Sequence, residues 1–391
     1  MPRAVLLDGG MGHQLRTMGV KIEGPLGTMQ RFLGVAMANS QQPELVTAAH
    51  LSYIDAGADV ITTNNYAVVP NCLVLCNDFS GDLSEIVKAH LADAGKAARA
   101  AVEQRPHRKV LVAGSLPPLA ESYRADRVAS FEDNLVQYTL IAESIAAYSD
   151  VLLCETMSTA DEARAAATAA GRFGKPVWIS WVLKPLGSMH NQAPVLMSGE
   201  SLAEALAALD GLPNIEALLF NCCAPEVITK AIAVLRAEPS LPVGVALGGY
   251  ANGFSETESG DGLNKEYRDI SPEEYWDSFA TRWLEDAGDG AIVGGCCGIF
   301  PPHIARMRAG IDSEPAAALP PTPSVSTEHD AGKRKSTPTV LALPAVAELL
   351  DGPPPTPPTA KRARAGDCGW QVKAGESSVV PPHTPECEAQ N

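Results

Sequence analysis

The sequence predicts an α/β protein, a (β/α)₈ TIM barrel with a disordered C-terminal tail. Two observations carry this prediction. Short apolar or β-branched runs alternate with longer amphipathic segments through the first 313 residues, which is typical of a parallel sheet covered by helices. The composition then changes, because residues 314–391 contain 14 of the 31 prolines. We therefore expect one large domain, residues 1–313, and a tail, residues 314–391.

Eight runs have the length and composition of strands. In chain order they are Ala4–Asp8, Asp59–Thr63, Lys109–Gly114, Val151–Glu155, Pro176–Leu183, Ala217–Asn221, Val243–Leu247 and Ala291–Gly294. Eight strands with intervening helices are the number that closes this type of barrel.

Amphipathic segments follow these strands and are expected to form the outer helices. They are Pro43–Asp55, Leu83–Glu103, Phe131–Tyr148, Ala160–Phe173, Leu202–Leu209, Pro225–Arg236, Pro272–Glu285 and His303–Ala309. The best start signal is Ser271 followed by Pro272, a capping residue before a proline in the first helical position. An open doubly wound sheet is the alternative. It should carry a G-x-G-x-x-G phosphate loop after the first strand, and residues 8–13 lack that spacing.

The tail is rich in proline and small residues and has two basic patches, residues 333–335 and 361–364. Such a composition buries too little apolar area to offset the entropy lost on ordering, so we expect disorder. The patches could contact an anionic partner or serve nuclear import, or they could be solvated charge alone. The sequence names no partner for the tail.

Charge and cysteine content restrict the class of protein. The net charge is −16, of which the domain carries about −14, and this acidity argues against nucleic acid as a partner. The sequence shows neither a signal-peptide pattern nor a membrane-spanning apolar stretch, so we expect a cytoplasmic protein without membrane association. Nine cysteines in a reducing compartment, with two adjacent pairs, suggest metal binding or redox chemistry rather than a disulfide framework.

Reactive residues gather at the carboxyl ends of the expected strands, where barrels place their chemistry. They are Asp8, Thr62, Thr63, Ser115, Glu155, Asn221, Cys222, Cys296 and Cys297. Three thiols from the sixth and eighth strands suit Zn²⁺, which binds thiolates in a tetrahedron and keeps one position open in catalytic sites. Side chains alternate along a strand, but Gly294, Gly295 and Gly298 should let both Cys296 and Cys297 turn toward one ion.

Only one ligand is expected from the Cys222 and Cys223 pair, and Cys222 lies closer to the strand end. The alternatives to a metal site are ordinary buried cysteines and a redox-active disulfide between neighbouring residues. For Cys72, Cys76 and Cys154 burial is the preferred interpretation.

The motifs resemble those of the homocysteine S-methyltransferase family, zinc barrels that use S-methylmethionine, S-adenosylmethionine or betaine as methyl donor. The matching segments, in family order, are residues 7–12, His50 with Tyr53, residues 56–64, residues 113–115, Glu155 with Thr156, residues 220–222 and residues 294–298. The glycine-flanked Cys296 and Cys297, preceded by Asn221 and Cys222, form the most specific of these motifs. His50 falls within an expected helix, so we interpret its match as structural and do not expect it to be a ligand.

The resemblance implies specific contacts with small-molecule substrates. It places Asp8 and Glu155 near the amino group of homocysteine and the backbone amides of Gly9 and Gly10 near its zwitterion. Thr63 and Asn221 are further candidates for substrate contact. Asp8 could instead form a turn, Glu155 could cap the next helix, and Thr63 could simply pack at the rim.

The function expected from these residues and this resemblance is zinc-dependent methyl transfer from a sulfonium donor to homocysteine, giving methionine. A betaine-dependent enzyme, or a methyltransferase acting on selenocysteine or another thiol, is an alternative within the family. A different class of protein is also possible, a zinc or thiol sensor that lacks catalysis and recruits a partner through its tail.

Overall fold

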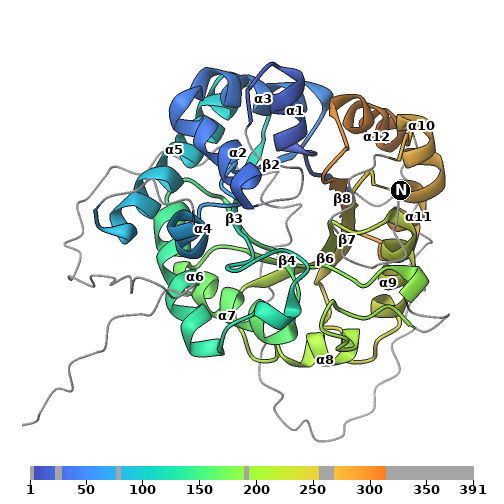
Figure 1. Cartoon of the computed structure of the whole chain (residues 1–391). Coiled ribbons are helices and arrows are strands. Elements are labelled where there is room, and N and C mark those ends of the chain that lie inside the picture. The colour runs from blue at the N-terminus through green and yellow to red at the C-terminus, as the bar shows by residue number, and fades with distance from the viewer. Residues whose placement is uncertain (1–3, 23–28, 76–80, 189–192, 255–267, 314–391) are drawn as a thin grey trace, which may run out of the picture.

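The computed structural model describes residues 4–22, 29–75, 81–188, 193–254 and 268–313, and these form a parallel β barrel surrounded by helices (Figure 1). The strands are β1 (Val5–Leu6), β2 (Val60–Thr62), β3 (Leu111–Leu116), β4 (Val151–Met157), β5 (Val177–Trp181), β6 (Ile215–Asn221), β7 (Ala246–Ala251) and β8 (Ile292–Gly295). They pair in the order β1-β8-β7-β6-β5-β4-β3-β2. The expected barrel fold is confirmed.

The barrel closes between β1 and β2 through few backbone contacts. Leu7 and Val60 form a single parallel bridge. The backbone N–H of Asp59 donates to the carbonyl of Leu6 over 2.7 Å, and the Asp59 carboxylate accepts the Leu6 N–H over 3.0 Å. Arg308 donates to the same carboxylate oxygen over 2.5 Å. A side chain therefore completes the seam that the short β1 leaves open.

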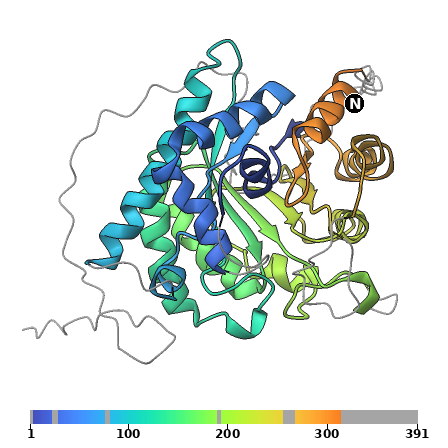
Figure 2. The same ribbon diagram turned by 45° about the horizontal axis from the view of Figure 1, so that its top comes forward.

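The helices cover the outside of the sheet in a ring, as Figures 1 and 2 show. They are α1 (Met11–Thr17), α2 (Met29–Gln41), α3 (Pro43–Ala56), α4 (Pro70–Leu75), α5 (Leu83–Glu103), α6 (Phe131–Ala146), α7 (Ala160–Ala170), α8 (Leu202–Ala207), α9 (Pro225–Arg236), α10 (Pro272–Tyr275), α11 (Thr281–Ala287) and α12 (Pro301–Ser313). Short helical turns are η1 (Ala125–Arg127), η2 (Gly171–Phe173), η3 (Leu186–Ser188) and the π turn η4 (Trp276–Ala280).

Alternating strand residues divide the core into an inner and an outer layer. On β6, Leu219 belongs to the cluster inside the barrel, whereas Leu218 and Phe220 belong to the larger cluster between sheet and helices. Both faces of the strands are thus buried, which explains why they read as nearly continuous apolar runs.

The bounds of α5 and α9 match the segments expected from the sequence. Three helices were not expected: α1, α2 and α4. The segment expected as one helix from Pro272 to Glu285 is divided into α10, η4 and α11. Ser271 does cap α10, because its side chain accepts the N–H of Glu274.

The expected position of the seventh strand was wrong by several residues. Val243, its expected start, is fully exposed, and β7 instead runs through Gly248 and Gly249 to Ala251. A Cβ on Gly248 would lie 1.7 Å from the carbonyl oxygen of Ile292 in β8. The glycines are therefore strand residues that allow close approach, rather than the end of the strand.

The expected disordered tail, residues 314–391, lies outside the described residues. Within the described part of the chain, no helix combines the length and the apolar character that crossing a membrane requires.

Candidate functional site

Cys222 is the first residue after β6, and its backbone is left-handed with φ +52°. Strict alternation would turn its side chain toward the helices, because Asn221 faces the barrel interior after Leu219. The positive φ changes this direction. The carbonyl of Cys222 accepts hydrogen bonds from Tyr123 Oη over 2.9 Å and from Asn252 Nδ2 over 3.0 Å. These two side chains stabilise a conformation that non-glycine residues rarely adopt.

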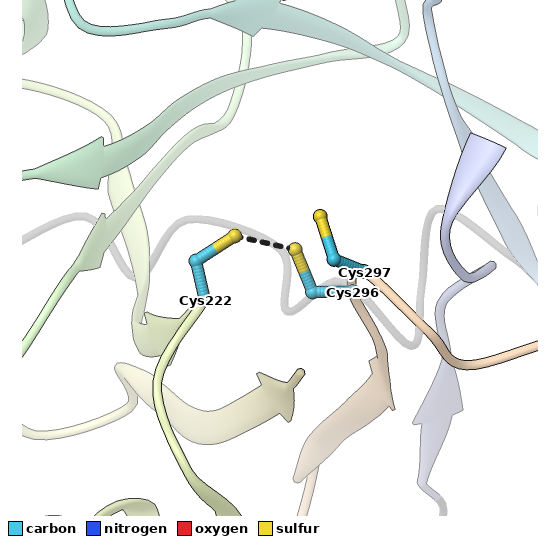
Figure 3. Close-up of side chains that lie close together, drawn as sticks. All are labelled: Cys222, Cys296 and Cys297. Carbon is cyan, nitrogen blue, oxygen red and sulfur yellow. Dashed lines mark hydrogen bonds between the residues drawn. The ribbon is translucent and has the colours of Figure 1, made fainter. Parts of the chain in front are cut away.

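Cys296 and Cys297 follow β8, and their sulfurs meet that of Cys222 (Figure 3). The three Sγ atoms all lie within 4.8 Å of one another, and those of Cys222 and Cys296 are 2.6 Å apart. In a tetrahedral zinc site with Zn–S bonds of about 2.3 Å, neighbouring sulfurs are separated by about 3.8 Å. The three thiols are a suitable donor set for one zinc ion, and the sulfurs of Cys222 and Cys296 would have to move about 1.2 Å apart to bind it together.

The glycines around this pair act differently from the expectation. Gly294 and Gly295 remain in β8, where a Cβ would lie 2.5 Å from Leu7 and 2.2 Å from Ile299, respectively. Only Gly298 adopts a left-handed backbone, with φ +78°. The first two glycines allow close packing and the third allows the turn.

Cys223 packs into the outer core, whereas Cys222 contributes to the sulfur cluster. None of the six cysteines in the described part of the chain forms a disulfide, and among them Cys72 and Cys154 are buried as expected. Cys76 lies outside the described residues.

The ionisation of each thiol in the sulfur cluster depends on that of the other two. Hydrogen bonds from the thiols of Cys296 and Cys297 lower the pKa of Cys222 well below its usual value. Their bonds to the Cys222 sulfur, together with burial, raise the pKa of each of the other two thiols. Because the three thiols are coupled, one thiolate shared among their sulfurs is favoured over two or three. Further negative charge is unfavourable until a cation compensates it.

Asp8 and Glu155 are buried carboxyl groups at the same end of the barrel. Asp8 accepts the backbone N–H of Thr62 over 2.8 Å and its hydroxyl over 3.2 Å. Burial raises the pKa of Asp8 to about 7 despite these bonds. Ser115 donates a short hydrogen bond to Glu155, yet burial, with smaller contributions from Cys222 and Asp8, raises the pKa of Glu155 to about 8.

Two of the alternatives for these carboxyls can be compared with the structure. Glu155 does not cap α7, because the capping side chain is Thr159, which accepts the N–H of Glu162. The carboxylate of Asp8 joins β1 to β2 through Thr62, so it has a structural contact beyond any substrate contact.

Thr63 and Asn221 have their polar atoms engaged within the protein. Thr63 Oγ1 donates to Asn65 over 2.5 Å and accepts the N–H of Ser115 over 3.0 Å, which favours the packing alternative. Asn221 Oδ1 accepts the N–H of Thr156 over 2.9 Å and the hydroxyl of Ser180 over 2.7 Å. Its Nδ2 donates to the Thr156 hydroxyl over 2.7 Å.

Gly9 and Gly10 pack against the loop that carries Cys296. A Cβ on Gly10 would lie 2.8 Å from the Cys296 carbonyl oxygen, and one on Gly9 would lie 2.5 Å from that of Ile299. The N–H of Gly10 donates to Ile299 over 2.9 Å. The glycines thus bring α1 close to the sulfur cluster, and the Gly10 amide already has a partner.

Several residues that support the site had no role assigned from the sequence. They are Tyr123, Asn252, Thr156 and His13. With the seventh strand placed correctly, Asn252 would have followed its carboxyl end, where polar residues are candidates for a barrel's functional site. Tyr123 and His13 make their contacts with residues far along the chain. The sequence around each of them therefore gives no indication of its role in the site.

Comparisons with known proteins agree with this geometry. Residues 5–311 match the family model described as homocysteine S-methyltransferase. The homocysteine S-methyltransferase of Escherichia coli is 28% identical over 317 residues, covering 78% of this chain and 94% of that protein. Homocysteine S-methyltransferase 3 of Arabidopsis thaliana is 26% identical over 81% of this chain and 92% of its own length. A selenocysteine methyltransferase of Astragalus bisulcatus is 23% identical, with 77% and 90% covered.

The fold comparison gives the same relationship. The crystal structure of the homocysteine methyltransferase of Escherichia coli in its metallated form has a TM-score of 0.62 and 25% identity. The match covers 78% of this chain and 96% of that one.

Proposed function

Since this chain belongs to the homocysteine S-methyltransferase family, we propose that it transfers a methyl group from a sulfonium donor to homocysteine in a zinc-dependent reaction. The donor is S-methylmethionine or S-adenosylmethionine, and the product is methionine. The observation that carries the proposal is the cluster of three sulfurs at the carboxyl end of the barrel. We assign Cys222, Cys296 and Cys297 as zinc ligands.

The chemistry requires a nucleophilic sulfur and an electrophilic methyl group. Zinc, when bound, would convert the substrate thiol, whose ordinary pKa is about 8.5, to a thiolate at neutral pH. The new S–CH₃ bond forms on homocysteine as the CH₃–S⁺ bond of the donor breaks. The electron pair of that bond stays on the donor sulfur, which becomes a neutral thioether.

Asp8 and Glu155 are proposed to bind the ammonium group of homocysteine. Both are buried beside the sulfur cluster, and burial raises the pKa of both. An ammonium group placed between them would favour their charged forms and so compensate the cost of burial. Gly9, Gly10, Thr63 and Asn221 act in this proposal mainly by shaping the pocket, because several of their polar atoms already have partners.

Residues 1–313 are proposed to form the complete catalytic domain, because the family match ends at residue 311. A cytosolic location, where thiols stay reduced, suits the three free cysteines of the cluster.

The test is zinc content measured together with product formation. Purified protein should contain about one zinc per chain and should form methionine from homocysteine with S-methylmethionine or S-adenosylmethionine, and less readily with betaine. Selenocysteine is included as acceptor because one relative is named for it. Protein that holds zinc but transfers no methyl group from any donor would contradict the proposal and support the sensor alternative.

Two matched substitutions test the ligand assignment. Cys297→Ser should lose the zinc and reduce methyl transfer by at least about a hundredfold, because two thiolates hold the ion poorly. Cys223→Ser changes an adjacent buried cysteine that packs in the outer core, and it should keep its zinc. Zinc loss in Cys223→Ser with retention in Cys222→Ser would reverse the assignment.

A further inference from the structure

One peptide unit beside the sulfur cluster is held by hydrogen bonds at both of its ends. The carbonyl of Cys297 accepts the N–H of Gly253 over 2.7 Å. The N–H of Gly298, which belongs to the same planar peptide unit, donates to His13 Nδ1 over 3.0 Å. The two partners come from different parts of the chain, since Gly253 follows β7 and His13 lies on α1. Together they determine the orientation of the unit.

The imidazole of His13 is itself held by aromatic neighbours. Phe254 meets it edge-on at a centroid distance of 5.8 Å, and Phe300 lies at 6.5 Å with the rings tilted by 59°. Because Nδ1 accepts a hydrogen bond, the ring is neutral and carries its proton on Nε2. A ring fixed in this way presents its acceptor in one direction.

The orientation of this peptide unit affects the sulfur cluster directly. The Cys297 side chain is attached to the carbon that begins the unit, and Gly298 adopts a left-handed conformation with φ +78°. Rotation of the unit would swing the Cys297 sulfur relative to those of Cys222 and Cys296. Metal sites tolerate misplacement of only about 0.5 Å in their ligands.

We infer that His13 is a positioning residue for the zinc site: its hydrogen bond to Gly298 holds the Cys297 thiolate in place for the ion. The inference rests on the proposed function for the identity of the metal, but not on methyl transfer. Residues that orient metal ligands commonly change affinity by about 10- to 100-fold when replaced.

Two variants test the hydrogen-bond acceptor and the aromatic ring of His13 separately. His13→Phe keeps an aromatic ring between Phe254 and Phe300 but has no acceptor. His13→Asn loses the ring but places Oδ1 the same number of bonds from Cα as Nδ1. The zinc dissociation constant of each full-length variant is measured by competition with a chromophoric chelator. His107→Phe, a change of an exposed histidine, is the control.

His13→Phe should raise the zinc dissociation constant about tenfold or more, whereas His13→Asn should stay within about threefold of the parent chain. The thiolate-to-cobalt absorption of the Co²⁺-loaded protein should shift in His13→Phe and be restored in His13→Asn. Thermal unfolding of the metal-free proteins shows whether folding has changed. If His13→Phe does not fold, His13→Leu takes its place against His13→Asn.

Equal affinity in His13→Phe and the parent chain would overturn the inference. So would a loss in His13→Asn as large as that in His13→Phe, because the ring packing alone would then explain the effect. These results are distinguishable from failure of the proposed function. A parent chain that binds zinc but transfers no methyl group contradicts that proposal, while the affinities still decide the role of His13.

Discussion

At the scale of single residues, the site depends on two unusual backbone conformations. Thr156 has φ +60° and Cys222 has φ +52°. Conformations of this kind cost about 1 to 3 kcal/mol each and persist where surrounding contacts hold them. Asn221 provides such contacts, since it precedes Cys222 and forms hydrogen bonds with both the backbone and the hydroxyl of Thr156. Its side chain thus joins the end of β6 to the part of β4 between Cys154 and Met157, where the register with β5 shifts.

Asn221→Ala should therefore destabilise the metal-free protein by about 2 to 4 kcal/mol, because the Thr156 N–H and the Ser180 hydroxyl lose their buried acceptor. Urea unfolding followed by circular dichroism measures this change. Asn134→Ala, which removes one bond to the carbonyl of Ala129, is the control and should cost about 1 kcal/mol. Equal losses in the two variants would contradict the proposed joining role.

At the scale of elements, close approach between strands decides where β7 lies. Gly248 pairs with Ile292 of β8, and Gly249 faces Ile228 of α9. A side chain at either position would occupy space already taken by the neighbouring strand or helix. The strand expected from the sequence, Val243–Leu247, ended just before these two glycines.

Gly248→Ala should destabilise the domain by at least about 3 kcal/mol, since the added methyl would meet the carbonyl of Ile292, which cannot move without disturbing the sheet. Gly187→Ala is the matched control, because a Cβ there meets nothing within 4 Å. Thermal unfolding of the two variants provides the comparison. A Gly248→Ala protein as stable as Gly187→Ala would show that β7 and β8 separate easily.

At the scale of the whole molecule, several carboxyl groups are buried in a domain of strongly acidic composition. Glu162, at the start of α7, accepts the N–H of Ser158 over 2.8 Å and lies 3.5 Å from the hydroxyl of Tyr138. Burial raises the pKa of Glu162 from 4.5 to about 7. His50 is buried in α3, and neither of its ring nitrogens has a hydrogen-bond partner among the described residues. Burial lowers its pKa to about 3.

These two shifts have opposite effects on stability. Between pH 4.5 and 7 the folded state binds the Glu162 proton more tightly than the unfolded state, so this group's contribution to stability falls as the pH rises. Between pH 3 and 6.5 the unfolded state protonates His50 and the folded state does not, so that contribution rises with pH. The pH dependence of stability measured on the parent chain alone therefore contains both contributions.

The difference between the parent chain and Glu162→Gln isolates the carboxyl group. Glu162→Gln should gain stability relative to the parent chain by about 1.4 kcal/mol per pH unit as the pH rises from about 4.5 to 7, and the difference should then level off. Urea midpoints of the metal-free proteins at several pH values measure it. A difference that is constant over this range would mean that Glu162 ionises normally in the fold.

The sequence alone determined the fold class and identified the three cysteines whose thiols come together. Local patterns carry both, because apolar periodicity specifies strands and helices, and two cysteine motifs at strand ends meet at one rim in any parallel barrel. The amphipathic helices α5 and α9 were predicted with their full bounds for the same reason. The helices α1 and α4 are too short for an apolar helical period to be recognised in their sequences.

Only the tertiary structure decided how the thiols are aimed and held. The left-handed turn at Cys222 depends on Tyr123 and Asn252, and the orientation of the peptide after Cys297 depends on His13. These partners come from distant parts of the chain, and contacts between them exist only once the barrel has closed. Local sequence therefore indicates which atoms form the site, whereas long-range packing sets their geometry.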